Sequence, residues 1–171
     1  MTQLIILINI AVFISQIINP AITYTYAFDS SVWYTYFSCC FLHGNLEHIL
    51  GNLLFLSFIF PVIEKRYGGL FLFGAYLFTG ACGNLLTALF DPTSIGLGAS
   101  GSIMGVMMLW IFHNLMEGRP LLIIAALMFF MKEGVMSGLT LIFSDGIGHL
   151  AHYGSALGAF FLLPIIYFKR K

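Results

Sequence analysis

Three short groups of polar residues interrupt a strongly apolar sequence, and their residue types are able to carry out chemistry. They occupy residues 43–52, 98–101 and 149–154. The first group supplies histidines and an asparagine, the second a serine among glycines, and the third two further histidines. Serine with a histidine base is a pairing that forms covalent intermediates in hydrolysis, and amide or imidazole N–H groups stabilise an oxyanion. The groups therefore indicate nucleophilic hydrolysis as one chemistry open to this chain.

Ser100 is the candidate nucleophile because of its place at the start of an apolar run. The first turn of a helix there has free backbone N–H groups and the positive end of the helix dipole. Residues 91–98 are poor in helix formers, which predicts an irregular segment that dips into the protein. Gly101 directly follows Ser100, so the G-x-S-x-G elbow of soluble hydrolases is not matched. A serine at this position also commonly caps or packs a helix, so Ser100 alone does not identify a hydrolase.

The composition places these polar groups in a membrane protein. A soluble domain carries about a quarter charged residues, whereas this chain is 60% hydrophobic and 8% charged. So few charges cannot cover a surface that faces water, and lipid must be the main solvent. The formal net charge is zero, which gives no indication of a nucleic-acid partner. Cys39, Cys40 and Cys82 lie in apolar runs and show neither a disulfide framework nor a metal-binding spacing.

Six apolar segments approach the length of about 20 residues that a bilayer span requires. Turn-forming residues separate them, including Pro61 at the end of the second segment and Asp91-Pro92 after the third. The predicted fold is a single all-α membrane domain over residues 1–171, built as a bundle of six transmembrane helices. The predicted segments are residues 4–19, 41–60, 69–90, 98–115, 120–142 and 147–168.

The positive charges predict how the bundle is oriented. Apart from Lys132, the lysines and arginines fall after the second segment, after the fourth segment and in the C-terminal tail. With six segments these positions share one side, which the positive-inside rule makes cytoplasmic. Both termini are then expected in the cytoplasm, and the bacterial inner membrane is the expected location. Lys132 and Glu133 fall inside the fifth segment, where they have either a local structural cause or a function.

Depth along the predicted helices places the polar groups in one layer. Counting from the charged boundary at 1.5 Å per residue puts Ser100 and His152 both about 26 Å above it. His48 lies about 24 Å and Asn52 about 18 Å above the same boundary, and the Asn52 side chain tilts upward. Since the hydrocarbon core is about 30 Å thick, all four side chains are expected just below the outer face.

Two patterns of small residues favour close packing of the helices that carry the serine and the histidine. Gly101-x-x-x-Gly105 follows the serine, and Gly154-x-x-x-Gly158 follows the histidine. Small residues four apart allow membrane helices to pack backbone to backbone. The patterns suit a short hydrogen bond from Ser100 to a histidine, although ordinary helix packing produces them as well.

The combination of motifs resembles the rhomboid family. The serine motif of that family, G-x-S-G, is matched by residues 98–101. Its second-helix signature, H-x-x-x-x-H-x-x-x-N, is matched by His43, His48 and Asn52, and the Ala-His pair of its last helix by residues 151–152. The order of the motifs also agrees, and the resemblance covers nearly the whole chain.

The resemblance implies a six-helix rhomboid-like bundle, of the bacterial type, and an intramembrane serine endopeptidase. Such an enzyme cuts transmembrane segments of membrane proteins near the outer face. Ser100 would be the nucleophile and His152 its base, as a dyad without an acidic third residue. Asn52, His48 and the backbone N–H of Ser100 would stabilise the oxyanion. No cofactor or metal is implied.

Three further residues receive structural roles from the resemblance. His43 would brace the loop before the second segment. Glu64 would stabilise the fold near the cytoplasmic end, and Gly98 belongs to the serine motif.

Alternatives remain open for the identity of the base and for the function of the protein. His149 lies one turn before His152 and is the competing base, and the family's glycines after the histidine are replaced by Ser155 and Ala159. A zinc site made by His43, His48, His149, His152 and Glu47 is a second reading, although the spacing does not match H-E-x-x-H. A catalytically inactive rhomboid-like protein that binds membrane proteins is the third.

Overall fold

The computed structural model describes residues 1–119 and 148–168, and these residues are helical with short connections. The predicted fifth segment, with Lys132 and Glu133, lies outside the described residues. The helices are α1 (Thr2–Ile18), α2 (Ala21–Tyr26), α3 (Thr35–Ser38), the 3₁₀ helix η1 (Cys39–Phe41), α4 (Leu46–Tyr67), α5 (Gly69–Phe90), α6 (Ser100–Met116), α8 (His149–Phe160) and α9 (Leu163–Phe168).

The all-α prediction agrees with the described residues, and α1, α5 and α6 lie within two residues of their predicted bounds. Among the described residues, α4 and α5 are long and apolar enough to cross a membrane, and α1 and α6 are apolar but shorter. A helix of 17 residues, the length of α1 and of α6, spans about 26 Å. The count of six transmembrane helices stays a prediction.

The predicted second segment is shifted along the chain. Helix α4 begins at Leu46, five residues later than predicted, because the side chain of Asn45 caps it by accepting a hydrogen bond of 2.8 Å from the His48 N–H. It also continues through Pro61 to Tyr67. Proline removes one helical hydrogen bond, and the burial of Phe60 and other apolar side chains on both sides of it holds the helix together.

The predicted last segment is broken in two. Helix α8 ends at Phe160, and α9 begins at Leu163 after a tight turn in which the Phe161 N–H donates to the Gly158 carbonyl at 3.1 Å. Pro164 explains the break, because proline cannot donate to the carbonyl four residues earlier and its ring collides with that carbonyl.

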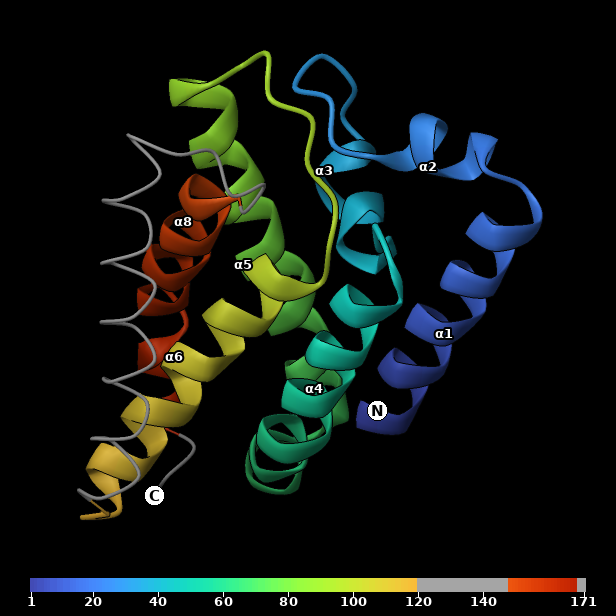
Figure 1. The fold of residues 1–171 in the computed structure, drawn as a ribbon. Helices are drawn as coiled ribbons and strands as arrows, with labels where there is room; N and C mark the ends of the chain where they lie inside the picture. Colours follow the sequence, from blue (N-terminus) through green and yellow to red (C-terminus); the bar gives the residue numbers. More distant parts are fainter. Residues whose placement is uncertain (120–147, 169–171) are drawn as a thin grey trace.

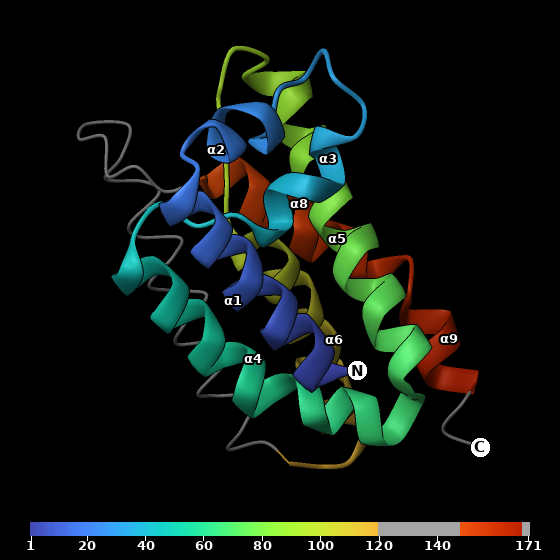
Figure 2. The ribbon, with the colours of Figure 1, turned by 90° about the vertical axis from the view of Figure 1, so that its right-hand side faces the viewer.

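The helices form one bundle whose two ends differ. Residues 27–38 and 91–97 lie at one end, and the α4–α5 junction and the end of α6 lie at the other (Figure 1). Helix α5 packs against α8, and α6 packs against both (Figure 1). Helix α1 lies alongside α4 (Figure 2). The core, with Phe60, Tyr76 and Leu109 fully buried, lies where α4, α5 and α6 meet.

The small residues of α8 face a different helix from the one that their pattern suggested. A side-chain carbon on Gly154 or Gly158 would lie within 2.8 Å of α5 atoms, so these glycines let α8 approach α5. On α6, Gly105 faces α5 too, and only Gly101 faces α8, where a side-chain carbon would meet Ser155 Oγ at 3.2 Å. Helix α5 is therefore the platform on which α6 and α8 are placed side by side.

Candidate active site

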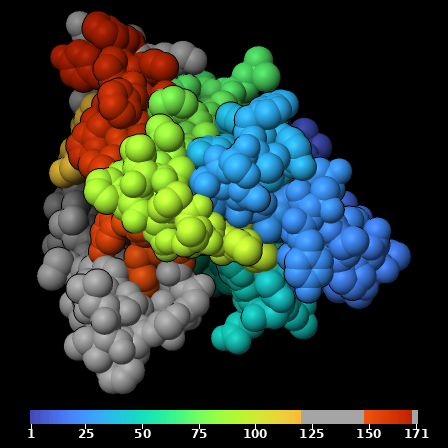
Figure 3. Space-filling model, turned by 90° about the horizontal axis from the view of Figure 1, so that it is seen from above, coloured from blue at the N-terminus to red at the C-terminus, as the bar shows by residue number. Residues whose placement is uncertain are grey.

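Ser100 is placed by a loop that hydrogen bonds anchor to the N-terminal part of the chain. The Phe28 N–H donates to the Gly96 carbonyl at 2.7 Å, in an isolated antiparallel bridge, and the Gly98 N–H donates to the Cys39 carbonyl at 2.9 Å. Ser100 follows as the first residue of α6. Seen from the loop end, residues 91–97 lie between the N-terminal loops and α8 (Figure 3). These anchors hold the serine at the positive end of the α6 dipole.

His152 lies within hydrogen-bond distance of Ser100. Its Nε2 atom is 2.9 Å from Ser100 Oγ, and the histidine is 8% exposed. It belongs to the first turn of α8, where its N–H donates to the Gly148 carbonyl. His149 lies one turn earlier, with its ring centroid 6.2 Å from that of His152. The structure therefore brings the predicted serine together with His152, and His149 lies beside this pair.

His48 lies against the backbone that precedes the serine. Gly98 has a φ of +132°, in the region that only glycine adopts easily. A side-chain carbon on Gly98 would approach Cε1 and Nε2 of His48 to 2.8 Å, and Ser100 Oγ to 3.7 Å. The glycine of the serine motif is thus required twice, for its backbone angle and for the space that the His48 ring occupies.

Asn52 lies one turn after His48 on α4. Its side chain is 7% exposed, and its Nδ2 atom has no hydrogen-bond partner among the described residues. A buried amide without a partner costs about 1–3 kcal/mol. A buried polar group that destabilises the fold in this way requires an explanation, and a role in binding or catalysis is one. Asn52 is therefore a candidate for such a role.

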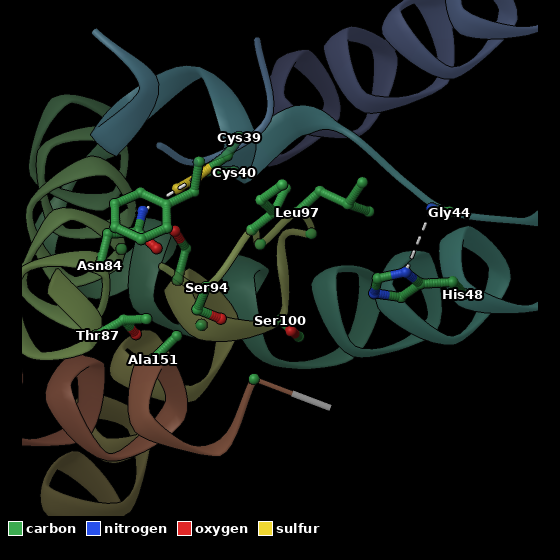
Figure 4. Close-up of a pocket in the computed structure, with 18 of the residues that line it drawn as sticks. Cys39, Cys40, Gly44, His48, Asn84, Thr87, Ser94, Leu97, Ser100 and Ala151 are labelled. Atoms are coloured by element: carbon green, nitrogen blue, oxygen red, sulfur yellow. Dashed lines mark hydrogen bonds between the residues drawn. The ribbon is translucent and has the colours of Figure 1, made fainter. Parts of the chain in front are cut away.

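A cavity of about 520 Å³ opens beside Ser100. Figure 4 shows Ser100 and His48 on one side of it, and Cys39, Cys40 and Asn84 on another. Gly98 and Gly101 also line the cavity, so backbone groups next to the serine are accessible from it. The cavity is large enough to take a short stretch of peptide beside the hydroxyl.

The cavity wall at η1 is held by an asparagine that sequence reasoning did not single out. Asn84 Nδ2 donates to the Tyr36 carbonyl at 2.8 Å and to Cys39 Sγ at 3.0 Å. Because the Cys39 carbonyl accepts a hydrogen bond from the Gly98 N–H, the contacts of Asn84 also hold the segment that leads to the serine. Cys39 and Cys40 are buried and not in a disulfide.

His43 is buried next to His48, and a second missed residue holds it there. The ring centroids of the two histidines are 5.1 Å apart. Gln16 of α1 accepts from the His43 N–H at 3.0 Å and donates to the His43 carbonyl at 3.2 Å. Its Nε2 also donates to Thr23 Oγ1 at 2.8 Å. The loop before α4 is thus braced through the backbone of His43, and Gln16 supplies the brace.

Glu64 lies far from Ser100, at the other end of α4. Its Oε2 atom accepts a hydrogen bond of 2.8 Å from the Thr2 N–H at the start of α1. A carboxylate at a helix N-terminus satisfies a free N–H and the dipole together. This hydrogen bond links α1 to α4. Glu64 does not line the cavity beside Ser100.

A metal site has no support from the described residues. Within residues 1–119 and 148–168, no group of three or more histidine, cysteine, aspartate or glutamate side chains is placed to hold a metal ion. Four of the five histidines instead form two pairs, His43 with His48 and His149 with His152.

Comparison with known proteins shows the family of this chain. Residues 30–169 match the Rhomboid domain. The chloroplastic Rhomboid-like protein 11 of Arabidopsis thaliana is 29% identical over 170 residues, which cover 90% of this chain and 60% of that protein. RHOMBOID-like protein 4 of the same plant is 40% identical over 70 residues, covering 41% of this chain and 18% of that protein. Rhomboid-like protease 3 of Toxoplasma gondii is 35% identical over 66 residues, covering 39% of this chain and 25% of that protein.

The chain thus spans 60% of the length of the first of these relatives and a quarter or less of the other two. The rhomboid family consists of integral membrane proteins and includes intramembrane serine proteases. Since the domain match extends over most of its length, this chain belongs to the rhomboid family.

Proposed function

We propose that this chain is an intramembrane serine endopeptidase with Ser100 as nucleophile and His152 as general base. The observation that carries the proposal is the distance of 2.9 Å between Ser100 Oγ and His152 Nε2. A serine and a base at hydrogen-bond distance are the minimum that nucleophilic hydrolysis of a peptide bond requires. His152, rather than His149, is the proposed base because it is the histidine at this distance.

The proposed reaction follows from this pair. His152 Nε2 takes the proton of Ser100 as Oγ attacks the scissile carbonyl, and then gives it to the leaving amine. The acyl-enzyme that remains is hydrolysed by water, again with His152 as the base. The burial of His152 keeps the imidazole in one place, so that two residues do the work of a longer triad.

Three donors are proposed for the oxyanion. The backbone N–H of Ser100 lies at the start of α6 and takes no part in helical hydrogen bonding. His48 lies against Gly98, and Asn52 Nδ2 is a buried donor with no partner among the described residues. One such donor contributes about 10²–10³ in rate. The Asn52 amide, which has no partner among the described residues in the resting protein, would gain a partner in the oxyanion of the transition state.

The proposed substrates are transmembrane segments of membrane proteins, cut near the face at which Ser100 lies. Ser100 lies toward the loop end of the bundle, whereas Lys65, Arg66 and Arg119 gather around one cavity at the opposite end. The positive-inside rule then makes the end with the cations cytoplasmic, and both termini with it. The compartment, predicted as the bacterial inner membrane, stays a proposal beside relatives that include a chloroplastic protein.

A cleavage assay tests the proposal. The full chain is reconstituted in liposomes with a single-span membrane protein, and the cleaved fraction is compared for wild type, Ser100→Ala, His152→Ala and His149→Ala. Wild type and His149→Ala are expected to cleave, and the other two variants to lose activity by at least about 10³-fold.

The outcome also separates the alternatives. Cleavage that persists in Ser100→Ala and stops with a chelator would replace the serine mechanism by a metal-dependent one. Binding of the substrate without cleavage by wild type, together with no labelling of Ser100 by a fluorophosphonate, would replace the protease by an inactive binder.

A further inference from the structure

A second cavity lies at the end of the bundle away from Ser100, between the last turn of α4 and the end of α6. It measures about 600 Å³ and is lined by Lys65, Arg66 and Arg119 together with Glu117. The cavity is separated from Ser100 by the length of α6, about 26 Å. It is therefore independent of the proposed catalytic residues.

The turn after α6 brings Arg119 to this cavity. Gly118 has a φ of +68°, and the Arg119 N–H donates back to the Asn114 carbonyl at 3.0 Å, which is the pattern of a glycine C-cap. The chain thereby folds back at the end of α6, and Arg119 joins the two cations of α4. Two elements far apart in the sequence contribute to one basic cavity.

The charge of the cavity favours an anion. Three cationic side chains and one carboxylate line it, which gives a net charge of +2. The carboxyl ends of α4 and α6 each add a partial negative charge of about one half, and the sum stays positive. Lys65 and Arg119 form no ion pair with a described residue. His113 also lines the cavity, but it is buried and 3.0 Å from the Tyr67 hydroxyl.

An apolar path leads away from the basic cavity along α4. Leu50, Leu54, Phe58 and Val62 follow one another at four-residue spacing on one side of that helix, and the first three are exposed. The path ends at the cavity, where Pro61 and Val62 form part of the wall. A molecule with a negative head and long apolar chains matches a basic cavity joined to an apolar helix face, and a free inorganic anion uses only the cavity.

We propose that the cavity formed by Lys65, Arg66 and Arg119 binds the phosphate headgroup of an anionic phospholipid. The acyl chains lie along the apolar side of α4. Basic pockets between transmembrane helices are suited to such headgroups, and each cation near the membrane surface contributes about 1 kcal/mol. The ligand would link α4 to the end of α6, at the end of the bundle opposite to the catalytic residues.

The first test counts bound lipids by native mass spectrometry of the full chain in a neutral detergent. Phosphatidylglycerol is compared with phosphatidylcholine of the same acyl chains. Wild type is expected to retain phosphatidylglycerol preferentially, and the double variant Lys65→Gln/Arg119→Gln to bind it about thirtyfold more weakly, about fivefold for each cation. The charge-conserving control Lys65→Arg/Arg119→Lys is expected to keep wild-type affinity.

The second test does not depend on those variants. Trp33 and Trp110 are the only tryptophans, and Trp110 precedes His113 and Glu117 by one and two turns of α6. In the variant Trp33→Phe, fluorescence of Trp110 reports on lipid at the cavity. Brominated phosphatidylglycerol at low mole fraction in phosphatidylcholine vesicles is expected to quench it more than brominated phosphatidylcholine does.

Three results would overturn the proposal. The first is equal binding of phosphatidylglycerol by wild type and a folded Lys65→Gln/Arg119→Gln variant. The second is equal quenching of Trp110 by the two brominated lipids, which decides the matter if the double variant fails to fold. The third is displacement of phosphatidylglycerol by millimolar inorganic phosphate at constant ionic strength, which would assign the cavity to a free anion.

Discussion

The two ends of the bundle hold their polar residues in opposite ways. At the Ser100 end the polar side chains are buried or half-buried, and single contacts decide the arrangement, as with His48 against Gly98 and His152 against Ser100. At the other end the cations are exposed around a cavity, and the net charge of the cavity determines what it binds. We therefore expect the end with Ser100 to respond to the addition or removal of a single atom, and the end with the cations to respond only to changes of charge.

The sharpest test of this contrast is a pair of glycine substitutions. Gly98→Ala adds a carbon at a positive φ and within 2.8 Å of His48, whereas Gly118→Ala adds one at a positive φ in open space. Gly98→Ala is expected to reduce kcat by about 10³-fold, as when an oxyanion donor is lost. Gly118→Ala should cost about 1 kcal/mol of stability without changing kcat. Equal activities of the two variants in the liposome assay would remove the proposed role of His48.

Two buried asparagines provide the next comparison. Asn52→Leu removes a buried amide whose Nδ2 atom has no partner in the described part of the chain, so kcat should fall about 10²-fold while the melting temperature is maintained or rises. Asn84→Leu removes an amide that is bonded to Tyr36 and Cys39, so the melting temperature should fall. Thermal melting and initial rates of both variants check this. A destabilised Asn52→Leu with unchanged kcat would make Asn52 structural.

Gln16 tests how far precise placement extends from Ser100. Gln16→Leu removes both hydrogen bonds to the His43 backbone, which should lower stability by about 1–3 kcal/mol. A small displacement of His48 should then lower kcat by about tenfold. Ser15→Ala is the matched control, because the Ser15 side chain is exposed and its hydroxyl donates to the Ala11 carbonyl of its own helix. An unchanged kcat in a Gln16→Leu protein of reduced stability would confine the sensitive region to the cavity itself.

The smallest effect is expected at Glu64. Glu64→Gln keeps an acceptor for the Thr2 N–H and removes the charge, so stability should fall by about 0.3–1 kcal/mol and kcat should not change. Chemical denaturation and the liposome assay measure the two quantities. A large loss of activity would show that the two ends of α4 are coupled and do not act independently.

The features of the fold that depend on local chemistry were predictable from the sequence. The apolar lengths predicted α1, α5 and α6. The count of residues from the charged boundary predicted that Ser100 and His152 lie at the same height, and their pairing was implied by the resemblance to the rhomboid family. The beginning of α4 was not predicted correctly, because Asn45 caps the helix by accepting a hydrogen bond from the His48 N–H. The apolar residues before Asn45 therefore lie outside α4. The continuation of α4 through Pro61 was missed because burial of its neighbours compensates the missing hydrogen bond.

The features that depend on tertiary contacts were not predictable in the same way. Gln16 is separated by 27 residues from the His43 backbone that it holds, and no spacing rule connects them. The Gly154-x-x-x-Gly158 pattern predicted close packing but not its partner, which is α5. Arg119 joins Lys65 only because of the turn at Gly118, so the basic cavity becomes visible in the fold and not in the sequence.

Labelling by a fluorophosphonate tests whether His152 activates Ser100, since it reports the reactivity of the serine without a substrate. The rate of labelling is measured for the full chain in liposomes and for Ser100→Ala, His152→Ala and His149→Ala. The expectation is labelling of wild type and His149→Ala at similar rates, strongly reduced labelling of His152→Ala and none of Ser100→Ala. Labelling that persists without Ser100, or that depends on His149 and not on His152, would contradict it.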